Sequence, residues 1–179
     1  MIRRWAAVGL AATLMAGAAQ AQISRDSSAP IDITADESEV INSQCVTIWR
    51  GDAEALQENN RLRAKVIKVY ANPRSGAGEN GQARCGDTNR LEAEGPVYYV
   101  TPNQTVRGDR AVYTAAEDTV VVTGDVIVVQ GKNVARGSRL TLNNKTGEAK
   151  MELSVSGRNK PGRVRGVFYP DSKPASGAR

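Results

Sequence analysis

Few residues in this chain have the chemistry of a catalytic or metal-binding site. The sequence contains no histidine, which excludes Ser-His-Asp and Cys-His arrangements and removes the usual nitrogen ligand of a zinc site. Carboxylate pairs such as Glu92 and Glu94 remain as acid–base candidates. Residues two apart on a strand share one face, and a solvated face explains this pair more simply. We therefore predict that the chain is not an enzyme and needs no metal or cofactor.

Two short motifs match functional patterns without the structure that those functions need. Gly76–Gly81 reads G-x-G-x-x-G, the pattern of a dinucleotide-binding turn, which requires a helix to follow. The next residues, Gln82–Asp87, are too short and glycine-broken for that helix, so we interpret the segment as a flexible loop. Arg107–Asp109 spells the Arg-Gly-Asp adhesion tripeptide, but it falls on a turn of the repeat described below, and we interpret it as structural.

The first residues have the pattern of a secretory signal peptide. Met1–Trp5 carries positive charge, an apolar run follows to Ala19, and Ala19-Gln20-Ala21 is a small-residue cleavage site. The apolar run is shorter than the roughly 20 residues of a membrane-spanning helix, which disfavours an uncleaved anchor. We predict a signal peptide over 1–21, a flexible segment over 22–29 and export to the periplasm. The chain is then only mildly basic, which gives no case for nucleic acid.

Cys45 and Cys85 are the two cysteines of the chain. Export places them in an oxidising compartment, where we expect a disulfide, with two separate thiols as the alternative. In the chain-entropy model such a bridge closes a loop of about 41 residues and stabilises the fold by roughly 4 kcal/mol.

An internal repeat organises the rest of the sequence. Residues 33–69 match residues 106–142 without a gap, so that Asp36 aligns with Asp109 and Gly51-Asp52 with Gly124-Asp125. A third copy starts at Gly95. Each copy reads as a glycine, a short apolar strand, a polar turn, a basic residue before a small one, and another strand. This pattern predicts an all-β domain: a sandwich, a jelly roll or a stacked meander.

The repeat also predicts the limits of the domain. Its first two copies are separated by Pro73–Asn89, rich in Gly, Asn, Ser and Arg, which we interpret as an exposed loop carrying Cys85. The residues from Pro170 onward are polar and small, and we expect a mobile tail over 170–179. The folded domain is therefore predicted over 30–169.

Alternation along the strands predicts which side chains face inward. In Arg61–Val69, apolar and basic residues alternate until the phase shifts by one, which indicates a bulge. The same inward pair then recurs in the three copies: Ile67 with Val69, Ala111 with Tyr113, and Leu140 with Leu142. The aromatic residues Trp49, Tyr98 and Tyr99 fit either core packing, which we favour, or a stacking platform for sugars.

Several segments resemble, in order, the periplasmic LptA/OstA family: Pro30–Asp36, Thr47–Ala53, Val120–Gly131, Ala135–Leu142 and Lys145–Ala149. The resemblance implies a twisted, open antiparallel β-jelly roll that binds lipopolysaccharide with its acyl chains between the sheets. It also implies a soluble bridge between an inner-membrane anchored Lpt subunit and the outer-membrane Lpt translocon, with head-to-tail self-association. The cysteine pair and the glycine-rich insertion depart from the family pattern.

With this resemblance, the inward apolar positions become candidates for a lipid-binding trough, each with ordinary closed core as the alternative. They are Val46, Ile48, Ala53, Ala55, Ile67, Val69, Val97, Tyr99, Ala111, Tyr113, Val126, Val128, Leu140 and Leu142. Basic residues at the rim are candidates for contacts with lipid phosphates, or simply a solvated face: Arg61, Arg63, Arg136 and Arg139.

Strand addition at the sheet edges is expected near Ile31–Ala35 and Val164–Phe168. The alternative function is a periplasmic β-sandwich adaptor or carbohydrate-binding structural protein. An enzyme that uses scattered carboxylates is the remaining possibility.

Overall fold

The computed structural model describes residues 29–77, 83–153 and 163–169. The predicted signal peptide over 1–21 and the predicted tail over 170–179 lie outside the described residues, as does nearly all of the segment over 22–29. The described elements are β1 (Asp32–Thr34), β2 (Glu37–Ile41), the short 3-10 helix η1 (Asn42–Gln44), β3 (Val46–Gln57), β4 (Asn60–Ala77), β5 (Ala83–Val100), β6 (Thr105–Thr114), β7 (Thr119–Gln130), β8 (Asn133–Asn143), β9 (Ala149–Glu152) and β10 (Arg165–Val167).

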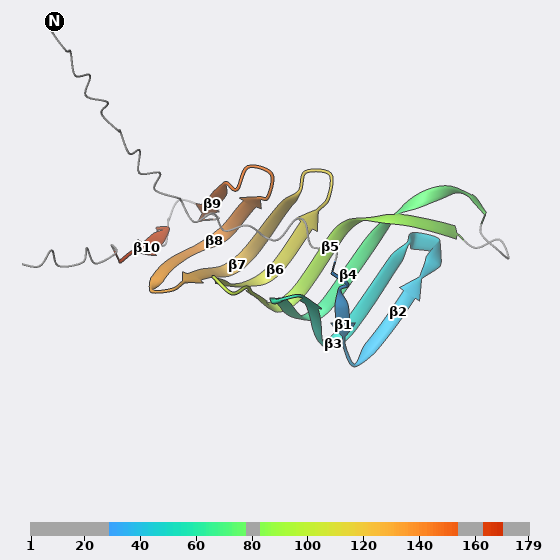
Figure 1. Ribbon diagram of the computed structural model, residues 1–179, viewed down its shortest axis with the longest axis horizontal. Helices are drawn as coiled ribbons and strands as arrows, with labels where there is room; N and C mark the ends of the chain where they lie inside the picture. Colours follow the sequence, from blue (N-terminus) through green and yellow to red (C-terminus); the bar gives the residue numbers. More distant parts are fainter. Residues whose placement is uncertain (1–28, 78–82, 154–162, 170–179) are drawn as a thin grey trace, which may run out of the picture.

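The strands form one open antiparallel sheet (Figure 1). Strands β3 to β8 pair in sequence order, each with its next neighbour along the chain. At one end, β1 and β2 pair with the two halves of β3; at the other, β10 and β9 pair with the two halves of β8. The predicted all-β, open antiparallel fold is confirmed, and the two segments expected at the sheet edges contain the edge strands β1 and β10.

A bend in the middle of each long strand explains the repeat. At the bend of β3, Gly51 and Asp52 together oppose Lys65 alone on β4, and the same kind of register shift recurs between the following strands. Gly51, Gly95 and Gly124 have φ values of +83°, +94° and +104°, a backbone region that glycine adopts at little cost. The glycine that opens each copy of the repeat therefore provides the bend of a strand.

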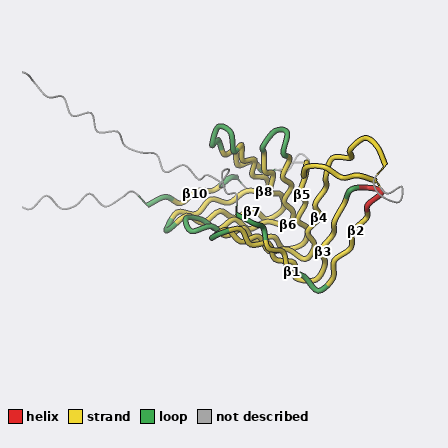
Figure 2. The backbone as a smooth tube through the Cα atoms, turned by 45° about the vertical axis from the view of Figure 1, so that its right-hand side comes forward, coloured by secondary structure: helices red, strands yellow, loops and turns green. Residues whose placement is uncertain are grey.

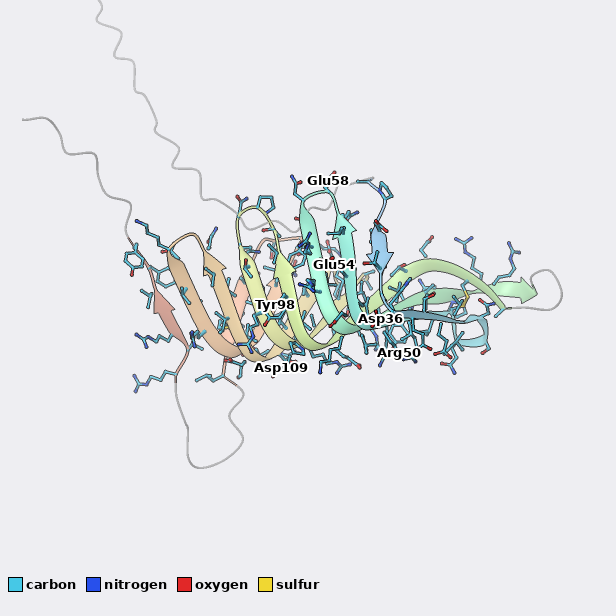
Figure 3. The ribbon with its side chains drawn as sticks, turned by 90° about the horizontal axis from the view of Figure 1, so that it is seen from below. Asp36, Arg50, Glu54, Glu58, Tyr98 and Asp109 are labelled. Atoms are coloured by element: carbon cyan, nitrogen blue, oxygen red, sulfur yellow. A yellow bond between two sulfur atoms is a disulfide. The ribbon has the colours of Figure 1, made fainter. Side chains whose placement is uncertain are left out.

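The aspartates that align in the repeat pack against these glycines. A Cβ atom on Gly51 would overlap the carboxylate of Asp36, and one on Gly124 would overlap that of Asp109. Oδ2 of Asp109 accepts a hydrogen bond from the backbone N–H of Asp125, 3.3 Å away. Figure 3 shows Asp36 and Asp109 near the bends of the strands. The Arg-Gly-Asp tripeptide thus lies at a bend inside β6, and its expected position in a turn is corrected to a kinked strand.

The described parts of the glycine-rich insertion are mostly exposed, as predicted, but they are paired strands and not a loop. Residues 78–82, which include most of the predicted flexible loop over Gly76–Gly81, lie outside the described residues. Strand β4 continues to Ala77 and β5 resumes at Ala83, so most of Pro73–Asn89 belongs to one long antiparallel hairpin. Strand, and no helix, follows the G-x-G-x-x-G pattern over the described residues 83–87. Backbone pairing explains the difference, and the side-chain amides of Asn89 and Asn72 add a hydrogen bond of 2.7 Å.

A disulfide joins this hairpin to the start of β3. Cys45 and Cys85 are bonded with an S–S distance of 2.01 Å. Cys45 directly follows η1 and is buried, and its carbonyl oxygen accepts a hydrogen bond of 2.9 Å from the backbone N–H of Ala71. The base of the hairpin is therefore fastened to the main sheet by a covalent bond and by a backbone hydrogen bond.

The bends and the twist give the sheet an inner and an outer face. The described turns collect along two borders, visible as two rows of loops in Figure 2. Buried apolar residues from both halves of the strands form one cluster: Ala53, Ala55, Ala64, Ile67, Ala93, Val97, Val106, Ala111, Val122, Val126 and Leu140. The cluster lies along the bends of the strands, where the two halves of the inner face meet.

Candidate functional site

The inner face carries continuous apolar rows across the sheet, because side chains of directly paired residues lie on the same face. On the first side of the bends the row is Trp49, Ile67, Ala93, Ala111, Val122 and Leu140. On the other side the row is Ala55, Leu62, Tyr99, Val106, Val128 and Ala135. Neither row contains a charged residue, so both rows are predominantly apolar across the sheet.

A cavity of about 550 Å³ opens on this face. Its walls are mainly apolar and come from β3 to β8, together with Ile31 next to β1: Ile31, Ala55, Leu56, Leu62, Leu91, Val97, Tyr99, Val106, Ala111, Tyr113, Val120, Val122, Leu140 and Leu142. Burial raises the pKa of the Tyr99 phenol above its ordinary value, because the cavity disfavours the charged phenolate. Such a volume falls within the range of small-ligand sites.

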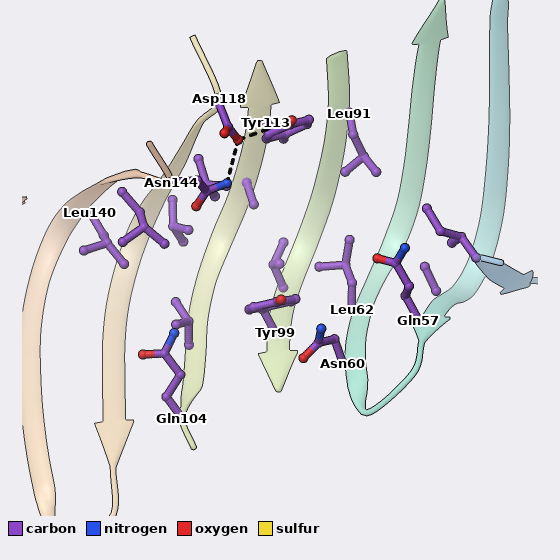
Figure 4. A pocket seen from close by; sticks show the side chains of 18 of the residues that line it. Gln57, Asn60, Leu62, Leu91, Tyr99, Gln104, Tyr113, Asp118, Leu140 and Asn144 are labelled. Atoms are coloured by element: carbon purple, nitrogen blue, oxygen red, sulfur yellow. Dashed lines mark hydrogen bonds between the residues drawn. The ribbon is translucent and has the colours of Figure 1, made fainter. Parts of the chain in front are cut away.

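Polar side chains lie at the two ends of the cavity (Figure 4). At one end, Oδ1 of Asp118 accepts a hydrogen bond from Nδ2 of Asn144 at 2.9 Å and another from the hydroxyl of Tyr113 at 3.4 Å. The other end carries three side-chain amides, of Gln57, Asn60 and Gln104. The cavity thus has an apolar middle and two polar ends of different composition.

Half of the predicted trough residues line this cavity, and others support it from the same face. Those in the lining are Ala55, Val97, Tyr99, Ala111, Tyr113, Leu140 and Leu142. Ala53, Ile67 and Val126 are on the inner face but fully buried near the bends. Val69 and Val128 are partly buried and pack against the same cluster. These five side chains support the floor of the cavity without lining it.

The prediction that Val46 and Ile48 face inward is wrong. Ile48 pairs with Lys68 and Val46 with Tyr70, whereas the inner row contains Trp49 paired with Ile67. The residues predicted to face inward change parity within β3, from Val46 and Ile48 to Ala53 and Ala55. At the bend, two residues of β3 oppose one residue of β4. The inner residues of β3 are therefore odd-numbered on both sides of the bend, whereas those of β4 change from even numbers before it to odd numbers after it.

This parity rule also identifies the inner residues that sequence analysis missed. The additional cavity-lining residues are Leu62, Leu91, Val106, Val120 and Val122, with Trp49 and Ala93 beside them in the core. The repeat contained the signal, since Leu91 and Val120 occupy equivalent places before the bends of β5 and β7.

The arginines predicted at the rim lie on the outer face. Arg63 pairs with Tyr98, Arg136 with Ile127 and Arg139 with Thr123, all positions that point away from the inner rows. Arg61 binds Oε1 of Glu54 at 2.8 Å on the same outer face. Their predicted contact with lipid phosphates at the cavity is therefore corrected to a position on the opposite side of the sheet.

The aromatic and acidic candidates also divide between the faces. Trp49 packs against the core cluster, and the neighbours Tyr98 and Tyr99 point to opposite faces, so they form no common stacking surface. Glu92 and Glu94 lie on the outer face. Glu92 is buried between Arg90 and Arg110, and Glu94 binds Nζ of Lys68 at 2.9 Å. The expectation of a solvated face is wrong for Glu92, because the two guanidinium groups cover it.

The open, bent antiparallel sheet with an apolar inner face has the architecture of a β-jelly roll. The family model for LptA/(LptD N-terminal domain) LPS transport proteins matches residues 32–148. The chain belongs to this family of lipopolysaccharide transport proteins, as its sequence resemblance predicted.

Two further proteins resemble the chain, one in sequence and one in fold. The chain is 29% identical to an uncharacterized protein of Rhizobium meliloti (strain 1021) over 177 residues, covering 94% of this chain and 90% of that protein. The crystal structure of LptH, the LptA homologous periplasmic component of the lipopolysaccharide transport device of Pseudomonas aeruginosa, superposes with a TM-score of 0.60. At 21% identity, with 79% of this chain and 96% of that chain covered, this likeness shows the shared fold. Over the described residues, no helix is long and apolar enough to cross a membrane.

Proposed function

We propose that this protein carries lipopolysaccharide through the periplasm and holds the acyl chains in the inner-face cavity. The observation that supports this function best is the pair of uncharged inner rows, which run across β3 to β8 beside a mainly apolar cavity of about 550 Å³. Each methylene group kept out of water gains about 0.8 kcal/mol, so an apolar trough removes most of the cost of moving a lipid between membranes. This role needs no catalytic residue.

We further propose that the protein is the soluble bridge subunit of the export machinery. The sheet is open at both ends, with β1 and β2 at one edge and β9 and β10 at the other. Exposed apolar side chains lie next to these edges, including Ile31, Val40 and Phe168. Strand addition at the two edges would join the inner-membrane anchored subunit, the outer-membrane translocon and further copies of the chain into one continuous trough. The predicted export signal and the domain over 30–169 fit such a periplasmic subunit.

Photocrosslinking at two adjacent tyrosines tests where the lipid binds. A benzophenone amino acid replaces Tyr99 in one variant and Tyr98 in the other, because Tyr99 lines the cavity and Tyr98 is exposed on the outer face. We expect lipopolysaccharide adducts at position 99 and none above background at position 98. Equal adducts at both positions, or adducts at position 98 alone, contradict a lipid site on the inner face.

A further inference from the structure

The two ends of the cavity differ in charge and in the hydrogen-bonding groups that they present. At the Asp118 end, the side chains bind one another, and the backbone N–H of Asn144 donates to the carbonyl of Asp118 at 2.9 Å. This end therefore presents only acceptors: a carboxylate that already accepts two hydrogen bonds within the protein, and the buried amide oxygen of Asn144, which accepts none from the described residues. A negatively charged group next to it would be repelled.

At the opposite end, the amides of Asn60 and Gln104 keep their hydrogen-bonding capacity. Within the described part of the chain, neither side-chain amide has a hydrogen-bond partner. Both residues are half-buried and line the cavity. Figure 4 shows them on the same side of the cavity as Gln57 and close to the ring of Tyr99. We call Gln57, Asn60 and Gln104 the amide cluster; of the three, Gln57 already donates from Nε2 to the carbonyl oxygen of Ala29 at 3.2 Å.

The fold fixes the amide cluster in place. Gln57 and Asn60 are a directly paired couple that closes the β3–β4 hairpin. Gln104 precedes β6, and its backbone N–H donates to the hydroxyl of Thr101 at 3.1 Å while its carbonyl accepts from the N–H of Thr101 at 2.9 Å. The side chains thus extend from two ordered turns on one border of the sheet.

An amide offers a donor and an acceptor on neighbouring atoms, and adjacent hydroxyl groups of a sugar ring offer the same pair in return. We infer that the amide cluster binds the sugar headgroup of the lipid and thereby sets its direction in the cavity. The headgroup lies at the β3–β4 and β5–β6 turns, and the acyl chains extend along the apolar walls toward Asp118. This inference rests on the proposed function, because it assumes that the cavity holds a glycolipid.

Binding of two ligands by the mature protein separates the inference from the proposed function. The ligands are purified lipopolysaccharide and a long-chain fatty acid, which has hydrocarbon but no sugar. The test protein carries Asn60→Leu and Gln104→Met, which keep the side-chain size and remove the amides. The matched control is Asn103→Leu, which removes an exposed amide from the same turn outside the cavity lining.

We expect the double variant to bind lipopolysaccharide about tenfold more weakly, because it loses two or three hydrogen bonds to the sugar. It should bind the fatty acid with an affinity within about twofold of that of the unmodified protein. The control variant should bind both ligands as the unmodified protein does. Unchanged affinity for lipopolysaccharide in the double variant, or an equal loss for both ligands, overturns the inference. An unmodified protein that binds neither ligand overturns the proposed function itself.

Discussion

The inner and outer faces of the sheet are built by the same strands from residues one position apart. The inner row is Trp49, Ile67, Ala93, Ala111, Val122 and Leu140, and the adjacent outer row is Ile48, Lys68, Glu92, Val112, Val121 and Thr141. The outer row contains two charged residues, Glu92, which lies between two arginines, and Lys68, which pairs with Glu94, whereas the inner row is apolar throughout. The difference shows that alternation along each strand separates a surface suited to hydrocarbon from a surface suited to water.

The largest effect on stability is expected from truncating a residue at the base of the inner face. Ile67 is fully buried in the core cluster, and Ile67→Ala should lower the free energy of unfolding by about 2–5 kcal/mol because it leaves a cavity. Its neighbour Val66 is half-buried on the outer face, and Val66→Ala should cost about 1 kcal/mol or less. Urea unfolding of both variants measures the contrast, and equal losses would show that the faces do not differ as described.

A smaller effect is expected at the bends that bring the two halves of the inner face together. Gly124→Ala places a Cβ atom on a residue with φ of +104° and against the carboxylate of Asp109, so we expect a loss of about 2 kcal/mol. Gly131→Ala has a positive φ of +56° but no atom within 4 Å, and should cost about 1 kcal/mol. Thermal or urea unfolding compares the two, and a Gly131 variant as unstable as the Gly124 variant would contradict the packing of Asp109 on Gly124.

The smallest effect is expected from an ion pair of the outer face. Nη1 of Arg107 lies 3.4 Å from Oδ2 of Asp125, and both side chains are largely exposed to solvent. Exposed pairs of this kind contribute little, so Arg107→Ala should change the free energy of unfolding by less than about 0.5 kcal/mol. A loss comparable with that of Ile67→Ala, measured in the same urea series, would mean that the outer face stabilises the fold as strongly as the inner face.

The repeat made most of the fold predictable from sequence. Glycines at Gly51, Gly95 and Gly124, with short apolar strands and polar turns between them, predicted an all-β domain, and the family resemblance predicted the open antiparallel sheet that the structure shows. The inward pairs after the bends, such as Ala111 with Tyr113 and Leu140 with Leu142, were found because they recur with regular spacing. Periodicity is a strong signal where the alternation of the strand is uninterrupted.

The remaining features depend on pairing between strands, which one sequence does not contain. Val46 and Ile48 were assigned to the wrong face because the parity across a bulge depends on how many residues the neighbouring strand places opposite it. The Pro73–Asn89 segment has the composition of a loop, yet partner strands and the bond between Cys45 and Cys85 organise it as a hairpin. The polar ends of the cavity combine residues from several turns, such as Asp118 with Asn144, and no local pattern marks them.

The central claim is that the lipid binds to the inner face, and two adjacent valines provide its most direct test. Val120 lines the cavity, and Val121 pairs with Val112 and Thr141 on the outer face; both are half-buried. The measurement is equilibrium binding of lipopolysaccharide to Val120→Glu and Val121→Glu, with the β-sheet content of both checked by circular dichroism. We predict that Val120→Glu weakens binding at least about tenfold, because a carboxylate in contact with acyl chains loses its hydration, while Val121→Glu stays within about twofold of the unmodified protein. Equal binding by the two folded variants, or a greater loss for Val121→Glu, would contradict the account.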